Sequence, residues 1–323
     1  MTPRPSNPAD RYQRRYGDPA PAARAMALDA RKPLRGNGRP SARRTRPVRP
    51  NAALEDQYRQ RLQTMIGEMN ASVLYWMRAA YKQHEPIMAM DGDDAKSMDC
   101  DADFGHGVPV FAMDRRSPAE FLRDAFKRLS NRWNENFAKA APRLADWFAV
   151  AAAKRSDAQL KNILRQGGFS VKFQMTPAAQ DIIDATVQAN VALIKSIPAQ
   201  YLTQVEGYVM RSVQTGRDLG QLTKDLQAQF GVTKKRAAFI ARDQNSKATA
   251  SITKARQLEL GLQEGIWMHS RAGKEPRPKH VAANGEKFDL RKGMKVGDKG
   301  GWVMPGEEIN CRCTWRPVIP GFS

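Results

Sequence analysis

Two cysteines near the C-terminal end of this chain have a spacing that could place both sulfurs on one metal ion. Cys311 and Cys313 lie in a run predicted to be a strand, where residues i and i+2 face the same way. His280 and His269 could complete a tetrahedral zinc site with them. The alternative is that the cysteines are small packed residues and that His280 hydrogen-bonds to a turn. We predict this alternative, with no metal or other cofactor bound, and no disulfide between Cys311 and Cys313, because it would close a very short, strained loop.

The sequence offers no further set of residues typical of a hydrolase or a nucleotide-binding enzyme. The chain has four histidines, and no Ser-His-Asp set, Cys-His pair with an orienting residue, or P-loop can be assembled at a familiar spacing. We therefore predict that the protein is not an enzyme and has no catalytic residues. The alternative that stays open is a zinc-dependent hydrolase or nuclease centred on His280, Cys311 and Cys313.

The elements that must position these residues are a small sheet and a long helix. Residues 265–317 contain short apolar or β-branched runs separated by Gly, Pro and Asn, which predicts a small mixed sheet. A helix over residues 233–260 carries Arg242, Asp243 and Gln244 in its middle. Either Asp243 or Gln244 faces the sheet and orients His280 or Arg312, or these residues form a buried polar brace. We favour the structural brace.

The residues before this module predict a mostly helical body. Apolar residues at three- and four-residue steps predict a helix over 52–84 that begins at Asn51. Further helices are expected from Ser117, with a kink or break at Pro142, over 157–166, from Thr176, from Pro198 and over 218–230. Residues 85–116 interrupt the pattern with a Gly-containing acidic loop. It lacks the closing Glu of an EF-hand, so we predict a mobile loop and not a calcium site.

The charge of the chain is concentrated at its N-terminal end. The net charge is +20, and residues 1–50 carry 13 Arg or Lys against 3 Asp, a net charge of +10. This segment is rich in Pro and poor in aromatic and β-branched residues, so we predict a disordered arm that binds DNA phosphates. The predicted DNA-binding residues are Arg31, Lys32, Arg35, Arg39, Arg43, Arg44, Arg46 and Arg49. A solvated tail and a targeting segment are the alternatives that composition leaves open.

The fold class predicted from these patterns is α+β: a mostly helical body with a small C-terminal mixed sheet packed on a long helix, after a disordered basic arm. We divide the chain into the arm (residues 1–50), a helical region with its acidic loop (51–174) and a C-terminal module (175–323). The N-terminus is not that of a signal peptide, and the longest apolar run is too short to span a bilayer, so we expect a soluble protein.

From about Met175 to the end, the chain resembles the phage Mu F-like head morphogenesis family. The resemblance rests on the order and spacing of several short motifs and not on any one of them. They begin with residues 191–198 and continue through Arg242, Asp243, Gln244, Trp267, His280, Gly285, Pro305, Gly306, Asn310, Cys311, Arg312 and Cys313. Some relatives look like they have a Cys pair where this chain has residues 277–280, Arg-Pro-Lys-His, which argues against zinc here.

The resemblance implies a minor head protein of a tailed bacteriophage that acts in head morphogenesis and in DNA packaging or delivery. Its implied partners are the portal or the major capsid protein, or both, and packaged double-stranded DNA, with no membrane. Its implied location is the virion, reached from the host cytoplasm during assembly. A plain nucleic-acid-binding protein with no place in a particle is the other alternative.

Overall fold

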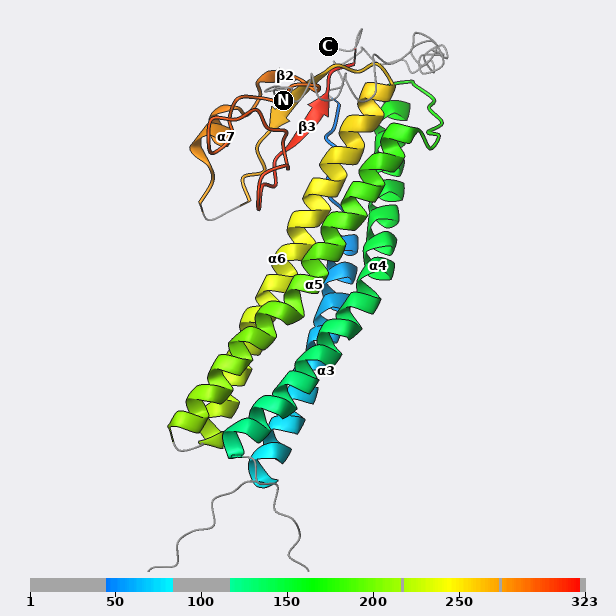
Figure 1. The fold of residues 1–323 in the computed structure, drawn as a ribbon. Helices are drawn as coiled ribbons and strands as arrows, with labels where there is room; N and C mark the ends of the chain where they lie inside the picture. The colour runs from blue at the N-terminus through cyan, green and yellow to red at the C-terminus, as the bar shows by residue number, and fades with distance from the viewer. Residues whose placement is uncertain (1–44, 84–116, 216–217, 273–274, 320–323) are drawn as a thin grey trace, which may run out of the picture. The chain divides into compact units, whose positions relative to one another are not determined.

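The computed structural model describes residues 45–83, 117–215, 218–272 and 275–319. Four long helices account for most of it: α3 (Ala52–Gln83), α4 (Pro118–Gln166), α5 (Pro177–Gln214) and α6 (Leu219–Glu259). They are followed by β1 (Glu264–Met268), the short helix α7 (Pro278–Ala282), β2 (Lys287–Asp289) and β3 (Thr314–Pro317). The predicted α+β class, a helical body with a small C-terminal sheet, is confirmed (Figure 1). The acidic loop and residues 1–44 lie outside the described residues.

The sheet is antiparallel throughout, so the expected mixture of strand directions is wrong. Its order is β2-β1-β3, with Gly265 opposite Phe288 and Trp267 opposite Trp315. The chain doubles back on β1 after α7, since the Gly285 N–H donates to the Trp267 carbonyl at 2.8 Å. A return along the same strand gives an antiparallel pairing.

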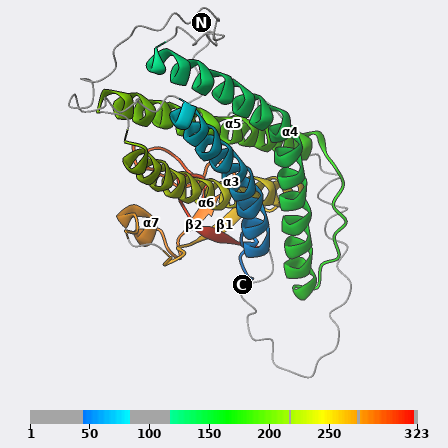
Figure 2. The same ribbon diagram turned by 90° about the horizontal axis from the view of Figure 1, so that it is seen from below.

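The sheet packs on the C-terminal part of α6, as predicted. The indole N–H of Trp315 in β3 donates to the Gln257 side chain of α6 at 2.8 Å, and Gln257 is fully buried. Ala250 and Leu258 of α6 share one apolar cluster with Trp267, Phe288 and Trp315. Figures 1 and 2 show the sheet beside α6 in two orthogonal views. The long helix is therefore the platform on which the C-terminal segments are assembled.

Local signals fix several helix ends where the sequence predicts them. The Asn51 side chain accepts the N–H of Leu54 at 2.9 Å at the start of α3. Ser117 and Glu120 form a reciprocal capping box at the start of α4. Gly168 and Gly261 take positive φ values of 88° and 76° just beyond α4 and α6. A left-handed residue closes a helix at low cost only where no Cβ is present.

Helix breaks expected at Pro142, before residue 157, at Pro198 and at Gly231 are absent. Pro142 lies inside α4, Pro198 lies inside α5, and Gly231 lies inside α6. An interior proline removes one backbone hydrogen bond, and a glycine costs about 1 kcal/mol relative to alanine. The apolar face continues past each of these positions, as in Ala141, Leu144, Ala145 and Phe148 around Pro142. Tertiary packing therefore outweighs the local preference for a break.

The described chain forms two compact units, and each long helix contributes residues to both. The first unit is Met1–Gln63, Ala138–Lys195 and Lys235–Ser323, and the second is Thr64–Phe137 and Ser196–Lys234. In the first unit, Tyr58 stacks on Phe148 with ring centroids 4.4 Å apart. In the second, the Tyr201 hydroxyl donates to buried Asn70 at 2.8 Å. No helix among the described residues has both the length and the apolar character needed to cross a bilayer.

Residues 45–50, the last part of the predicted arm, belong to the folded first unit. The Thr45 hydroxyl donates to the Pro317 carbonyl at 2.7 Å, and Val48 is buried in a cluster with Leu160 and Ile319. The backbone of Arg49 exchanges two hydrogen bonds with the Gln159 side chain. These contacts anchor the chain at the point where the basic segment ends.

One buried arginine connects α4, α6 and the segment between α4 and α5. Arg256 makes two parallel hydrogen bonds to Asp157, at 2.9 and 3.0 Å, and one to the Gln174 carbonyl at 2.6 Å. It also pairs with Glu259 at 3.0 Å. The Arg256 side chain is 4% exposed, so these bonds form largely away from water.

We expect Arg256→Met to lower the free energy of unfolding by about 2–4 kcal/mol, because it leaves Asp157 and the Gln174 carbonyl without their donor. Urea unfolding followed by circular dichroism measures the change. The matched control is Arg59→Met, which removes an exposed ion pair with Asp56 and should cost less than about 1 kcal/mol. Equal costs for the two variants would contradict the structural role of Arg256.

Candidate metal centre and the motif around it

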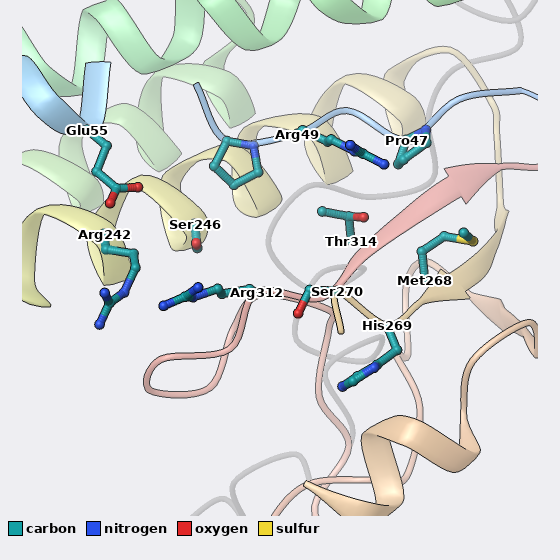
Figure 3. Close-up of a pocket in the computed structure, with 11 residues that line it drawn as sticks. Pro47, Arg49, Glu55, Arg242, Ser246, Met268, His269, Ser270, Arg312 and Thr314 are labelled. Carbon is teal, nitrogen blue, oxygen red and sulfur yellow. The ribbon is translucent and has the colours of Figure 1, made fainter. Parts of the chain in front are cut away.

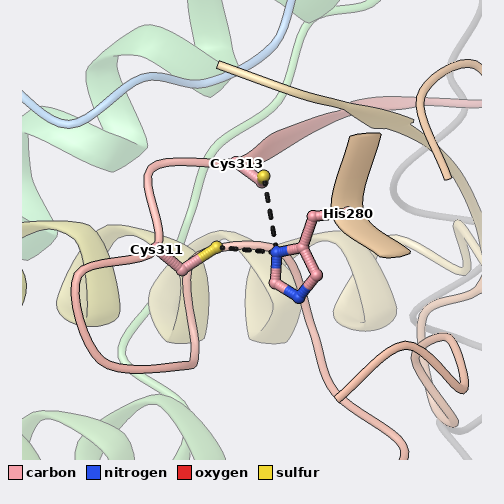
Figure 4. A group of neighbouring side chains, drawn as sticks. All are labelled: His280, Cys311 and Cys313. Atoms are coloured by element: carbon pink, nitrogen blue, oxygen red, sulfur yellow. Dashed lines mark hydrogen bonds between the residues drawn. The ribbon is translucent and has the colours of Figure 1, made fainter. Parts of the chain in front are cut away.

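Three predicted site residues meet in one buried cluster. His280 comes from α7, and Cys311 and Cys313 come from the segment just before β3. Nδ1 of His280 lies 3.5 Å from Sγ of Cys311 and 3.8 Å from Sγ of Cys313 (Figure 4). All three residues are buried, and both thiols are free. The donor atoms all lie within 4.8 Å of one another.

A strand was expected to position the two cysteines, but a turn positions them. Asn310 has a positive φ of 59°, and the Cys311 N–H donates to the Glu308 carbonyl at 3.0 Å. The backbone N–H of Gly306 approaches Sγ of Cys311 at 3.4 Å. The strand β3 begins only at Thr314, so Cys311 and Cys313 both precede it. Their sulfurs nevertheless face the same imidazole.

The cluster separates the two thiols electrostatically. A hydrogen bond from the Cys313 thiol lowers the pKa of Cys311; burial opposes this shift, and His280 and the Gly306 N–H support it. The same hydrogen bond, together with burial, raises the pKa of Cys313. Burial lowers the pKa of His280, but the hydrogen bond to Cys311 and the negative charges of Cys311 and Glu308 outweigh it, so the net shift is upward. Without a metal, these shifts favour a Cys311 thiolate beside a neutral Cys313, and the raised pKa of His280 favours its protonated form.

Glu308 contacts the other nitrogen of the same imidazole. Nε2 of His280 lies 3.0 Å from Oε2 of Glu308, yet neither atom makes a hydrogen bond of good geometry, and both are buried. Arg277 approaches the same carboxylate at 3.6 Å and pairs with Asp298 at 2.8 Å. A small rotation of the ring would align its Nε2–H with the Glu308 carboxylate.

The donor set fits zinc. With Zn–N near 2.0 Å and Zn–S near 2.3 Å, a tetrahedral site has N···S edges of about 3.5 Å and S···S edges of about 3.8 Å. The measured N···S separations of 3.5 and 3.8 Å lie close to these values. A carboxylate on the second ring nitrogen, where Glu308 lies, is the usual partner of a zinc-bound histidine. Zinc would here link α7 to the turn before β3, and the fourth ligand would come from the adjoining cavity.

That cavity has a volume of about 70 Å³ and is lined in part by His269 and Glu275. His269 was one of the four zinc ligands considered from the sequence, but the structure does not group it with the other three. Its Nδ1 accepts the N–H of Arg271 at 3.3 Å instead.

Asp243 holds the turn that carries Cys311. Its Oδ1 accepts the N–H of Asn310 at 2.7 Å, and its Oδ2 pairs with Lys247 at 2.8 Å. Asp243 is 6% exposed, so the bond to Asn310 is charge-assisted and largely protected from water. Among the described residues, no hydrogen bond or ion pair joins this carboxylate to His280 or Arg312; it contacts the backbone one residue before Cys311.

A chain of buried hydrogen bonds extends from Asp243 into the helices of the first unit. The Gln244 side chain donates to Asp243 at 3.3 Å and accepts from Asn190 of α5 at 3.3 Å. Asn190 in turn accepts the Tyr58 hydroxyl of α3 at 2.9 Å. Side chains from α3, α5 and α6 therefore support the backbone of the cysteine turn.

The other motif residues close the structure around this cluster. Trp267 is fully buried and meets the His280 ring edge-on, with centroids 5.1 Å apart. Gly285 has a φ of 94° at the turn after α7. Pro305 is buried, and a Cβ on Gly306 would lie 3.3 Å from the Cys313 carbonyl and 3.4 Å from Ala250 of α6. Arg242 and Arg312 lie outside the cluster of His280, Cys311 and Cys313 and line a separate cleft.

Several residues that support the cluster were not found from the sequence. Glu308, Lys247 and Asn190 all contact motif residues or their supports. Glu308 stands three residues before Cys311, but carboxylates are common in turns and no spacing rule marks this one. Of these residues, Asn190 could most readily have been identified from the sequence, because a polar residue on the apolar face of a predicted helix needs a buried partner.

Comparison with known proteins places the motif in a family. Residues 203–316 match the family described as Phage Mu protein F like protein. We call residues 203–316, which resemble that family, the Mu F-like segment. The match contains every motif residue from Arg242 to Cys313, whereas the motif over residues 191–198 precedes it. It relates about a third of the chain to that family.

A relative from Haemophilus influenzae (strain ATCC 51907 / DSM 11121 / KW20 / Rd), described as an uncharacterized protein, is 30% identical over 290 residues. The alignment covers 88% of this chain and 57% of the relative, so the chain spans little more than half the length of that protein. No solved structure matches the chain. The Mu F-like segment is therefore the part of the chain with an assigned family.

We expect about one zinc ion per chain in protein purified from zinc-supplemented cells without chelator, because three buried donors have tetrahedral spacing. Cys311→Ser and Cys313→Ser should each lose the metal, and chelation should lower the melting temperature of the wild-type protein. Inductively coupled plasma mass spectrometry measures the metal.

The matched control is Cys100→Ser, which changes the chain's third cysteine and should keep the zinc. A wild-type protein free of zinc under these conditions would support the sequence-based prediction of no metal, with the thiolate–imidazolium pair as the native state.

Proposed function

We propose that this protein is a minor head protein of a tailed bacteriophage, which acts in head morphogenesis and in DNA packaging or delivery. The match of residues 203–316 to the Mu F-like family carries the proposal. The structure supports it because the motif residues of the matched segment form one braced arrangement around Asp243 and the His280 cluster. The proposed location is the virion, after assembly in the host cytoplasm.

The proposed protein partners are the portal, the major capsid protein, or both. The Mu F-like segment exposes large apolar side chains: Val281 is 44% exposed, Trp302 42% and Ile309 63%. Exposed residues of this type are favourable anchors for a protein interface. Trp302 and Ile309 lie in the connection that leads to the cysteine turn, so docking would engage the family motif directly.

The proposed nucleic-acid partner is packaged double-stranded DNA. The net charge of +20 favours a polyanionic partner, and half of it lies in residues 1–50. Binding through phosphates is independent of sequence and sensitive to salt, which suits a protein that meets the whole genome. Of the eight predicted DNA-binding residues, only Arg46 and Arg49 lie within the described part of the chain, and both are exposed.

We propose a structural and not a catalytic role for the His280 cluster. A catalytic zinc needs a position that substrate can reach. His280, Cys311 and Cys313 are only 2%, 3% and 6% exposed. The alternative, a zinc-dependent hydrolase or nuclease, predicts turnover of DNA that is lost with the metal, and an assay of DNA cleavage with and without chelator tests it.

The Mu F-like segment should dock the protein into the head. We expect the surface variant Trp302→Ser/Ile309→Ser to reduce incorporation several-fold, because it removes apolar anchors without disturbing the core. Trp267→Ala, which leaves a cavity in the core, should also prevent incorporation. The measurement is the amount of each variant in purified heads.

Tyr75→Ser is the matched control for incorporation, since Tyr75 is 65% exposed but lies on α3, outside the family match. Normal incorporation of the Trp302→Ser/Ile309→Ser variant would show that this surface does not face the portal or capsid.

The arm should supply a large part of the DNA affinity. The deletion should end at residue 44, because Thr45 and Val48 are part of the folded first unit. Residues 1–44 carry 11 basic and 3 acidic residues, a net charge of +8. We expect their removal to weaken DNA binding and to flatten the plot of log K against log salt, by about 0.9 for each lost phosphate contact.

The melting temperature of the truncated protein should stay near that of the full chain, which serves as the control for folding. A salt dependence identical to that of the full chain would show that the arm does not contact DNA.

A further inference from the structure

A cleft of about 360 Å³ lies in the first unit, next to the cysteine turn but separate from the His280 cluster. It is formed by residues 47–50, the start of α3, the middle of α6, the end of β1 and the beginning of β3. Three arginines line it, namely Arg49, Arg242 and Arg312, together with His269. Figure 3 shows Arg312 extending toward Arg242, with the hydroxyl of Ser270 close by.

The positive charge of this cleft is not neutralised within the described residues. Glu55 is the one carboxylate among its lining residues, against three guanidinium groups. None of the ion pairs between described residues involves Arg49, Arg242 or Arg312. Nε of Arg242 is buried and has no hydrogen-bond partner in the described part of the chain. A buried donor without a partner is costly, so a bound acceptor would stabilise it.

The polar lining between the arginines consists of hydroxyl groups. Ser246, Ser270 and Thr314 all border the cleft. Guanidinium and hydroxyl donors together are the groups that proteins use most often to hold phosphate oxygens. The cleft has no set of amide side chains that would read base edges.

We propose that this cleft binds a phosphodiester group of the DNA backbone. The proposal rests on the proposed function, because it assumes the same DNA partner and names the site on the folded unit that holds it. An acidic protein segment is the other anion that three arginines could take. DNA is favoured because Arg49 is the last basic residue of the predicted arm (residues 1–50), so the end of the arm lies at the cleft.

The site adds two contacts from the Mu F-like segment to those of the arm. Arg242 and Arg312 belong to the family motif, whereas Arg49 belongs to the N-terminal segment. The cleft thus holds one strand between two parts of the chain that are far apart in sequence. Its volume suits a backbone phosphate and its neighbours, not a groove of duplex DNA, so binding there is independent of base sequence.

The test is binding of the full-length protein to a short random-sequence duplex and to one of its single strands, over a range of salt concentrations. We expect Arg242→Gln/Arg312→Gln to weaken binding and to lower the slope of log K against log salt by roughly 1.8 on duplex, about 0.9 for each lost contact. Arg49→Gln should lower the slope by about half as much, and its exposed side chain can be replaced without disturbing the core.

Arg132→Gln is the matched control, because Arg132 is an exposed arginine of α4 that does not line the cleft. Melting temperatures near that of the wild type confirm that the variants are folded. If the wild type binds DNA and the cleft variants behave like Arg132→Gln, the cleft proposal is overturned while the proposed DNA partner stands.

Two further outcomes would also decide the matter. A wild type that binds neither DNA probe overturns both the DNA partner and this site. A polyglutamate peptide that binds the wild type and not Arg242→Gln/Arg312→Gln, with DNA binding unchanged by the substitutions, assigns the cleft to a protein partner. Incorporation into heads is scored separately, so a failure of the cleft proposal is not confused with a failure of the head assignment.

Discussion

The arrangement of the Mu F-like segment depends on one charge-assisted hydrogen bond, from the Asn310 N–H to the buried carboxylate of Asp243. Asn310 takes a left-handed conformation, which costs free energy for a residue with a side chain. The bond at 2.7 Å offsets that cost and fixes the direction in which Cys311 leaves the turn. Because Asp243 is held by Gln244, Asn190 and Tyr58 in turn, the geometry of the turn is set by the packing of three helices.

Much of the fold could be predicted from local signals, because those signals act over a few residues. Asn51, Ser117 and Gly261 mark helix ends through caps and a positive φ, and the structure places the ends there. The breaks predicted at Pro142 and Pro198 were wrong because the local preference of proline competes with tertiary packing. Each residue weakens a helix, but the apolar face on both sides of it is already committed to the same core. The local cost can be inferred from the sequence, whereas the packing that outweighs it depends on contacts between residues far apart in the chain.

The candidate site was predictable in its residue types and not in its connections. His280, Cys311 and Cys313 could be grouped because few side chains ligate metals and two of them are close in sequence. The role of Glu308 could not be predicted, because it depends on the path of a turn. The cleft was even harder to predict from the sequence. Arg49 and Arg312 are 263 positions apart, and they meet at one surface because residues 45–49 hydrogen-bond to α4 and Pro317 and because Val48 is buried.

The His280 cluster and the cleft share a short stretch of backbone. Cys311 and Cys313 face His280, whereas Arg312 and Thr314 line the cleft. The side chains of Cys311 and Cys313 thus face one site and those of Arg312 and Thr314 the other, so one stretch of chain serves both. The position of the Arg312 guanidinium therefore depends on how firmly its two neighbours are held. A zinc ion would fix both neighbours at once. Without one, both sulfurs still contact Nδ1 of His280, and Asp243 fixes the residue before them. On this view the buried cysteines act structurally, by holding an arginine in place for its partner at the surface.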